Sequence, residues 1–241
     1  MPVDNLGYRP WRGERMSQLM RPLVVAYGGI ALVWRRKWLR FMILFSWLPI
    51  VVFGLGIFAY EYSIAVPTMR TGIARTLAVE LNRPDMAFDV LQDHNSARHD
   101  VWCLMILTFF RIPQLVAMVL LIGLIAPMLI SYDLRSKAYL MYFCRPLSPI
   151  QYIIGKSGVI WFFLSMITAL PACALYLVAI MMSPDLSVIG DTWDIPLRIA
   201  AATVVLVVPT SALALCYSSF TSESRYASFS WFATWVMGGV A

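Results

Sequence analysis

Long apolar runs alternate with short charged segments along this 241-residue chain. The runs are continuously hydrophobic, whereas the strands of a membrane barrel alternate apolar and polar positions, so the pattern predicts an all-α bundle of transmembrane helices. A helix needs about 20 residues to cross the apolar core of a bilayer. We predict spans at residues 41–60, 111–130, 157–182, 199–217 and, begun but incomplete, 226–241.

A shorter apolar stretch precedes the first span, between Arg21 and Trp34. It holds twelve residues, is interrupted by Gly28 and Gly29, and is too short to cross a bilayer. We predict a helix that lies in the cytoplasmic membrane interface, in contact with lipid. Its expected anchors are aromatic and basic side chains, which place their apolar parts in lipid and their polar ends in water: Trp34, Arg35, Arg36, Lys37 and Trp38.

Composition and charge place the chain in the cell membrane as a multi-pass protein. Hydrophobic residues make up 60% of it and charged residues 13%, against roughly 25% charged residues in a soluble domain. Residues 1–40 carry eight basic and two acidic groups, whereas residues 61–100 carry four and six. The positive-inside rule therefore predicts a cytoplasmic N-terminal segment at 1–40, a membrane domain at 41–241 and an outer loop at 61–110.

A further apolar stretch, residues 101–110, ends at Arg111 and is closely followed by Pro113. Counting about twenty residues back from the next charged segment places Arg111 at the outer membrane surface. We therefore expect residues 101–110 to form an interfacial or re-entrant helix on the outside. A functional arginine inside the membrane is the alternative.

Patterns that would indicate catalysis or cofactor binding are weak. Gly155-Lys156-Ser157 resembles the end of a phosphate-binding loop but lacks its first glycine and a preceding strand. No known catalytic motif is found, so we predict neither an enzyme nor a cofactor. We expect no nucleic-acid partner, because the basic aromatic segment near residue 36 leads directly into a span. Metal binding is not predicted either, because the potential ligands are badly spaced: His94, His99, Cys103, Cys144, Cys173 and Cys216.

The charged segment between the second and third spans, residues 131–156, has the pattern of a rigid elbow at the bilayer surface. An Asp133/Lys137 pair at i,i+4 favours a helix from Ser131 to Phe143. That helix should end before Pro146. Ser148-Pro149-Ile150-Gln151 then has the pattern of a capping box that starts a new helix. An ordinary loop between two helices is the alternative.

The sequence of this elbow resembles the signature of the type-2 ABC transporter permease family. In that signature a D/E-x-R-x-G/K-A run leads to R/K-P-L-S/T and then to Y-x-x-G-K. The resemblance covers about 25 residues, and Pro127 and Cys144 depart from it. The matching positions are Asp133, Arg135, Lys137, Ala138, Arg145, Pro146, Leu147, Ser148, Tyr152, Gly155 and Lys156.

The resemblance implies a permease subunit, with six spans, whose elbow docks on a separate ABC ATPase subunit. A second permease half, the same chain or a related one, would complete an exporter. Because the chain stops within the fifth predicted span, we expect one or more further spans. The residues expected to couple to the ATPase are Asp133, Arg135, Lys137, Arg145 and Pro146, with Glu223 and Arg225 as weaker candidates.

The predicted spans hold almost no ionisable groups, which argues against a proton-driven pump and favours a hydrophobic or bulky amphipathic cargo. The competing hypothesis is a membrane assembly or scaffold protein that transports nothing. In that case the same elbow would only tether a cytoplasmic partner. A neighbouring coding sequence with a phosphate-binding loop and an ABC signature would distinguish the two.

Overall fold

The computed structural model describes residues 17, 20–63, 66–138, 140, 147–183 and 187–240, and these contain helices but no strand. Four helical runs in this part of the chain are long and apolar enough to cross a membrane, and they overlap the first four predicted spans. The helix α14 (Ser224–Val240) has 17 residues and overlaps the fifth predicted span, whose last residue, 241, lies outside the described residues. The four runs are Lys37–Tyr62, Ser96–Arg135, Pro149–Met182 and Asp194–Phe220.

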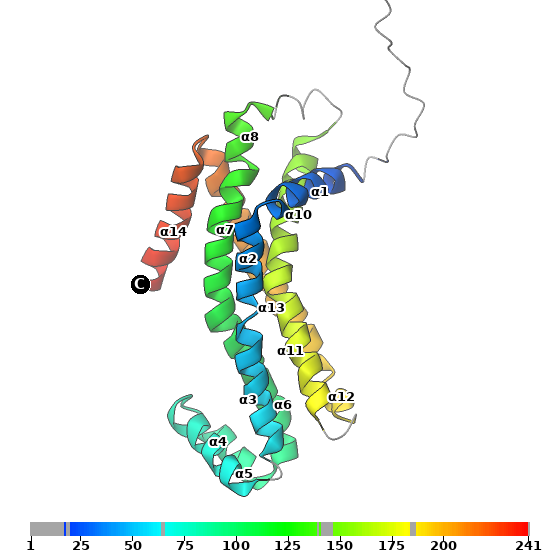
Figure 1. Cartoon of the computed structure of the whole chain (residues 1–241), viewed down its shortest axis with the longest axis vertical. Helices are drawn as coiled ribbons and strands as arrows, with labels where there is room; N and C mark the ends of the chain where they lie inside the picture. The colour runs from blue at the N-terminus through cyan, green and yellow to red at the C-terminus, as the bar shows by residue number, and fades with distance from the viewer. Residues whose placement is uncertain are drawn as a thin grey trace, which may run out of the picture.

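Most of these runs are divided into shorter helices that lie end to end along the long axis (Figure 1). Shorter helices lie before or between these runs. The first run consists of α2 (Lys37–Ser46) and α3 (Pro49–Tyr62), and the second of α6 (His94–Phe109), η2 (Phe110–Gln114), α7 (Leu115–Leu129) and α8 (Ser131–Arg135). The third consists of α10 (Pro149–Ile167) and α11 (Ala169–Met182), and the fourth is α13 (Asp194–Phe220).

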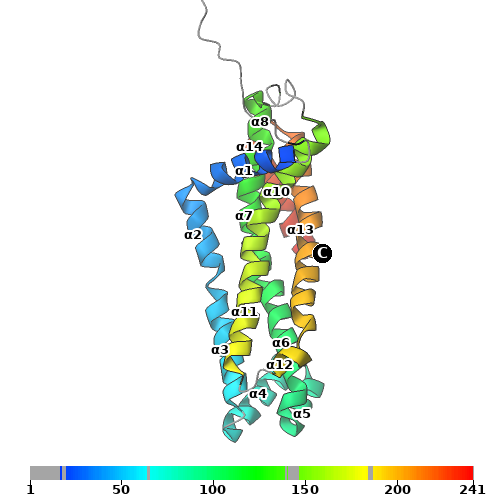
Figure 2. The ribbon, with the colours of Figure 1, turned by 90° about the vertical axis from the view of Figure 1, so that its right-hand side faces the viewer.

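The segments between the runs gather at two opposite ends of the bundle. One end, here called the α8 end, holds α1 (Arg21–Trp34), α8, the start of α10 and the turn before α14 (Figure 1). The other, the α5 end, holds α4 (Pro67–Val79), α5 (Pro84–Gln92) and α12 (Val188–Asp191) (Figure 2). The charge pattern of the sequence separates these segments in the same way, because it places residues 1–40 and residues 61–110 on opposite sides of the membrane. Which end faces the cytoplasm stays a prediction.

The second run corrects one sequence prediction. Residues 101–110 do not form a separate helix, because one helical run continues from Ser96 to Arg135 over 40 residues. Pro113, expected to mark a boundary, lies inside the π-helix η2, where the wider turn accommodates it. Arg111 is exposed on this run. The proline therefore distorts the helix locally and does not end it.

Three of the runs are interrupted at one level of the bundle. The first is broken at Trp47 and Leu48, the second at η2, and the third at Thr168. Side chains from one interruption reach the next: Trp47 Nε1 donates to the carbonyl oxygen of Met166 at 3.1 Å, and Gln114 Nε2 donates to that of Ser46 at 3.2 Å. These bonds satisfy carbonyls near the interruptions that would otherwise face an apolar environment.

The same level separates two hydrophobic cores. The core on the α8 side includes Ile122, Ile125 and Phe163. The core on the α5 side includes Tyr60 and Trp102, both fully buried. Each core draws residues from three or more helical segments, so each half of the bundle has its own packing.

The predicted N-terminal helix is present as α1, which packs against α10 and lies across the long helices (Figure 2). Its position in a membrane interface stays a prediction. The two helices approach closely through small residues. A methyl group added at Gly155 of α10 would lie 2.7 Å from Cβ of Val25 and 2.9 Å from the carbonyl oxygen of Pro22. A methyl group added at Gly29 of α1 would lie similarly close to the side chain of Val159.

We expect Gly155→Ala to lower the free energy of unfolding by about 1–3 kcal/mol, because backbone in α1 must move to admit the methyl group. Thermal unfolding of the purified protein in detergent measures this. Gly28→Ala is the matched control, since nothing lies within 4 Å of a methyl group there. An equal loss in both variants would show that the close approach of α1 to α10 is unimportant for stability.

Candidate partner-binding site at the α8 end

Asp133, predicted as a surface contact, is buried at the end of the second run. Its Oδ2 lies 2.7 Å from Nζ of Lys156 and accepts a hydrogen bond from the Tyr152 hydroxyl at 2.7 Å. The side chains of Asp133 and Lys156 are only 10% and 7% exposed. The carboxylate therefore ties the end of the second run to the start of the third, and the protein surface does not present it.

The start of α10 explains how this cluster forms. Ser148 Oγ accepts from the backbone N–H of Gln151, and Gln151 Oε1 accepts from that of Ser148, each at 3.2 Å. This is the predicted capping box, which is confirmed. It fixes the first turn of α10, and because Tyr152 and Lys156 are four residues apart they share a helical face. Both side chains thus reach the same carboxylate.

The other half of the predicted elbow is shorter than expected. The helix predicted from Ser131 to Phe143 is broken after Arg135, where α8 ends. Ala138 and Leu140 are again helical, and residues 139 and 141–143 lie outside the described residues. Lys137 has a φ of 54°, in the left-handed region, so the chain has already left the helix there. The i,i+4 pairing of Asp133 with Lys137 was therefore a wrong prediction, because Asp133 bonds instead to residues of α10.

A second buried link joins α8 to α13, and the sequence reasoning did not find it. Ser131 Oγ donates to the carbonyl oxygen of Ser218 at 2.8 Å, and Ser218 Oγ donates to that of Ala126 at 2.8 Å. Both serines are fully buried. A polar residue at the end of an apolar run was the available signal, but its partner lies 87 positions away in the chain.

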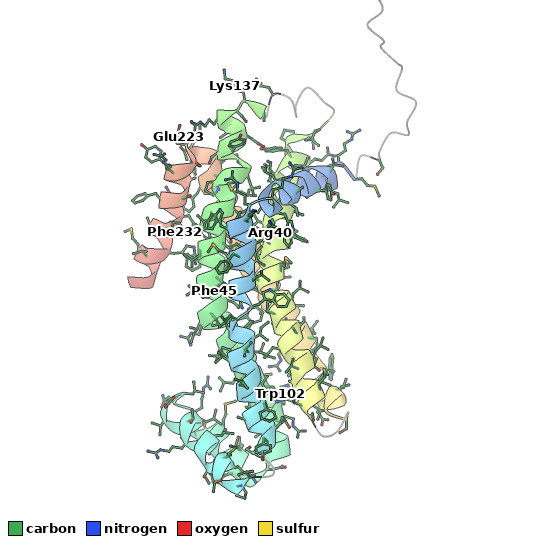
Figure 3. The ribbon with its side chains drawn as sticks, viewed as in Figure 1. Arg40, Phe45, Trp102, Lys137, Glu223 and Phe232 are labelled. Carbon is green, nitrogen blue, oxygen red and sulfur yellow. The ribbon has the colours of Figure 1, made fainter. Side chains whose placement is uncertain are left out.

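Four charged residues remain exposed around this buried framework, and together they are called the α8 corner: Arg135, Lys137, Glu223 and Arg225. Arg135 Nη1 lies 3.8 Å from Oε2 of Glu223, with side chains 65% and 49% exposed. Figure 3 shows Lys137 and Glu223 at this end of the molecule and Trp102 toward the other. A weak, solvated ion pair of this kind leaves both groups available to a partner.

The remaining predicted residues are placed as follows. Arg145 and Pro146 lie outside the described residues. The expected membrane anchors lie at and around the turn from α1 into α2, at the α8 end. Trp34 and Trp38 are 39% and 47% exposed, as anchoring in an interface requires. The basic anchors Arg35, Arg36 and Lys37 are exposed as well.

The α5 end contains a buried charged cluster that the sequence reasoning missed. Arg98 Nε lies 3.1 Å from Oε1 of Glu61, and Trp102 Nε1 donates to the same oxygen at 3.2 Å. Oε2 of Glu61 is buried and makes no hydrogen bond within the described residues. Among those residues no group of three or more histidine, cysteine or acidic side chains could hold a metal ion.

Comparisons with known proteins found no matching family model, no similar curated protein and no similar solved structure.

Proposed function

We propose that this chain is the membrane-spanning subunit of an ABC exporter, in which ATP hydrolysis by a separate subunit drives movement of a substrate across the membrane. The elbow sequence, with its resemblance to type-2 permeases, supports the proposal. The structure adds a physical basis for coupling. The exposed α8 corner lies next to buried bonds that join α8 to α10 and α13, which belong to two other long apolar runs.

That connection between corner and spans is the observation that carries the proposal. A force applied at Arg135 reaches α10 through Asp133, and α13 through Ser131. The contact surface for the ATPase is then the α8 corner together with Arg145 and Pro146. Asp133 takes a different role from the one predicted from the sequence. It does not touch the partner, and it links α8 to α10 through Tyr152 and Lys156. In this proposal the α8 end is cytoplasmic and a second permease half completes the pathway.

The double variant Arg135→Gln/Lys137→Gln tests the proposal. The partner is the product of a neighbouring coding sequence that carries a phosphate-binding loop and an ABC signature. We expect permease-stimulated ATP hydrolysis to fall by roughly five- to tenfold, as two charged contacts of about 1 kcal/mol or less each are lost, while the permease remains inserted. Arg75→Gln, an exposed arginine of α4 at the α5 end, is the matched control and should change nothing.

Undiminished stimulation of ATP hydrolysis in the double variant would show that the α8 corner is not part of the surface that couples to the ATPase. A partner that binds the chain without any stimulated hydrolysis or transport would favour the competing scaffold function.

A further inference from the structure

A cavity of about 280 Å³ opens at the α5 end, between α6 and α13 and beside the start of α5. Both long helices run from this end toward the middle of the bundle (Figure 1). Arg83 is the N-cap residue of α5. The apolar lining residues that follow Asp100 lie one to three turns further in, and Ala202 lies one turn further in than Arg198, whereas Met86 and Ile195 lie near the charged residues. They include Arg83, Asp100 and Arg198 at the charged end, and Leu107, Phe110 and Ala202 at the apolar end.

The three charged residues are held in place from different elements. Arg83 follows Asn82, whose φ of 51° makes the sharp turn between α4 and α5, and its backbone N–H bonds to the Leu77 carbonyl oxygen at 2.9 Å. Arg198 Nε lies 2.7 Å from Asp194. His99 lies between Asp194 and Asp100, at 3.0 and 3.1 Å. The lining of the charged end therefore carries two cations and one anion, and the Asp194 carboxylate, which is not part of the lining, is bonded to Nε of Arg198.

This distribution selects a class of ligand. Guanidinium groups bind phosphate oxygens well, and a carboxylate beside them accepts hydrogen bonds from an ammonium group but repels a second anion. The apolar end takes hydrocarbon. Ligand pockets typically measure about 300–1,000 Å³. At about 280 Å³ this cavity lies just below that range, so it has room for a head group and only the first part of a tail. The rest of the tail would lie along the apolar helix surfaces.

We propose that this cavity binds an aminophospholipid, a lipid whose head group joins a phosphate to a primary ammonium group. The phosphate lies toward Arg83 and Arg198, the ammonium toward Asp100, and the acyl chains enter beside Leu107 and Ala202. The site does not depend on the transport function proposed above, and its test needs no ATPase.

Native mass spectrometry of the purified full chain in detergent measures lipid retention. The probes are phosphatidylethanolamine, phosphatidylglycerol and phosphatidylcholine with identical tails. We expect the primary amine lipid to be retained best. Arg83→Gln should weaken all three by about tenfold, and Asp100→Asn should weaken only phosphatidylethanolamine. Ala202→Trp, which fills the apolar end, should abolish specific retention. The controls are Arg75→Gln and Val204→Trp, both at exposed positions that do not line the cavity, and they should behave as wild type.

Alkylation of Cys103 provides a second readout that does not rely on a bulky substitution, because this free thiol lines the cavity. Phosphatidylethanolamine should slow its alkylation by about fivefold or more, as a bound tail covers the thiol, and should leave the exposed Cys216 unaffected. Equal retention of all three lipids would overturn the assignment of the head group. Retention by Ala202→Trp equal to wild type, or an unprotected Cys103, would overturn the site itself.

Discussion

Replacement of Lys156 by methionine is expected to lower the free energy of unfolding by about 3–5 kcal/mol. The side chain of Lys156 lies 2.7 Å from the Asp133 carboxylate, and both are nearly inaccessible to solvent. Methionine fills a similar volume but leaves a buried carboxylate with one remaining hydrogen bond, from Tyr152. An unpaired buried charge costs far more than the net stabilisation its ion pair contributes. Reversible unfolding of the purified protein in mixed detergent micelles measures the loss.

Two further variants separate this charge effect from a simple loss of packing. Asp133→Asn/Lys156→Met removes both charges and should recover most of the lost stability. Arg135→Gln, which breaks only the exposed pair with Glu223, should cost less than about 1 kcal/mol. If the double variant is as unstable as Lys156→Met alone, the unpaired charge is not the cause and the prediction fails.

Replacement of Arg98 by methionine should have a comparable effect at the opposite end, about 3–5 kcal/mol. Glu61 would keep one hydrogen bond, from Trp102 at 3.2 Å, and its other oxygen already lacks one within the described residues. Glu61→Gln/Arg98→Met should be much less destabilised, because the amide oxygen still accepts from Trp102 without a charge. Thermal unfolding of the purified variants in detergent measures the loss.

Arg75→Gln is the control for Arg98→Met, since this arginine is exposed on the neighbouring helix α4. It should leave the unfolding temperature within error of wild type. If Arg75→Gln lowers the unfolding temperature as much as Arg98→Met does, the α5 end is sensitive to any change of charge. The buried pair of Glu61 and Arg98 would then not be the cause of the destabilisation.

The local features of the fold were predictable because neighbouring residues determine them. Four apolar runs were found by their length, and the capping box at Ser148 and Gln151 by its spacing. The continuity of the helix through Arg111 and Pro113 was not, because a proline usually ends or kinks a helix. Here the π-helix η2 absorbs it. Sequence spacing gave no means of distinguishing these outcomes.

The role of Asp133 was mispredicted for a related reason. Its nearest opposite charge along a helix is Lys137, but its actual partners, Tyr152 and Lys156, lie on the far side of the turn. The pairing of Glu61 with Arg98 likewise spans 37 positions. Both pairs depend on how separate helices pack against each other, and one sequence read by itself contains no direct signal of that packing.

Because three of the four long helical runs are interrupted at one level, that level is where the bundle is expected to bend. The 19 residues of α10 extend about 28 Å from that level to the α8 end at the usual helical rise. A rotation of about 10° there would displace the α8 corner by roughly 5 Å, a full helical turn in length. Each half could keep its own core through such a movement, because the two cores are separated at the level of the interruptions at Trp47, η2 and Thr168. Resistance to bending at this level would then come from the undivided helix α13 and from the side-chain bonds of Trp47 and Gln114.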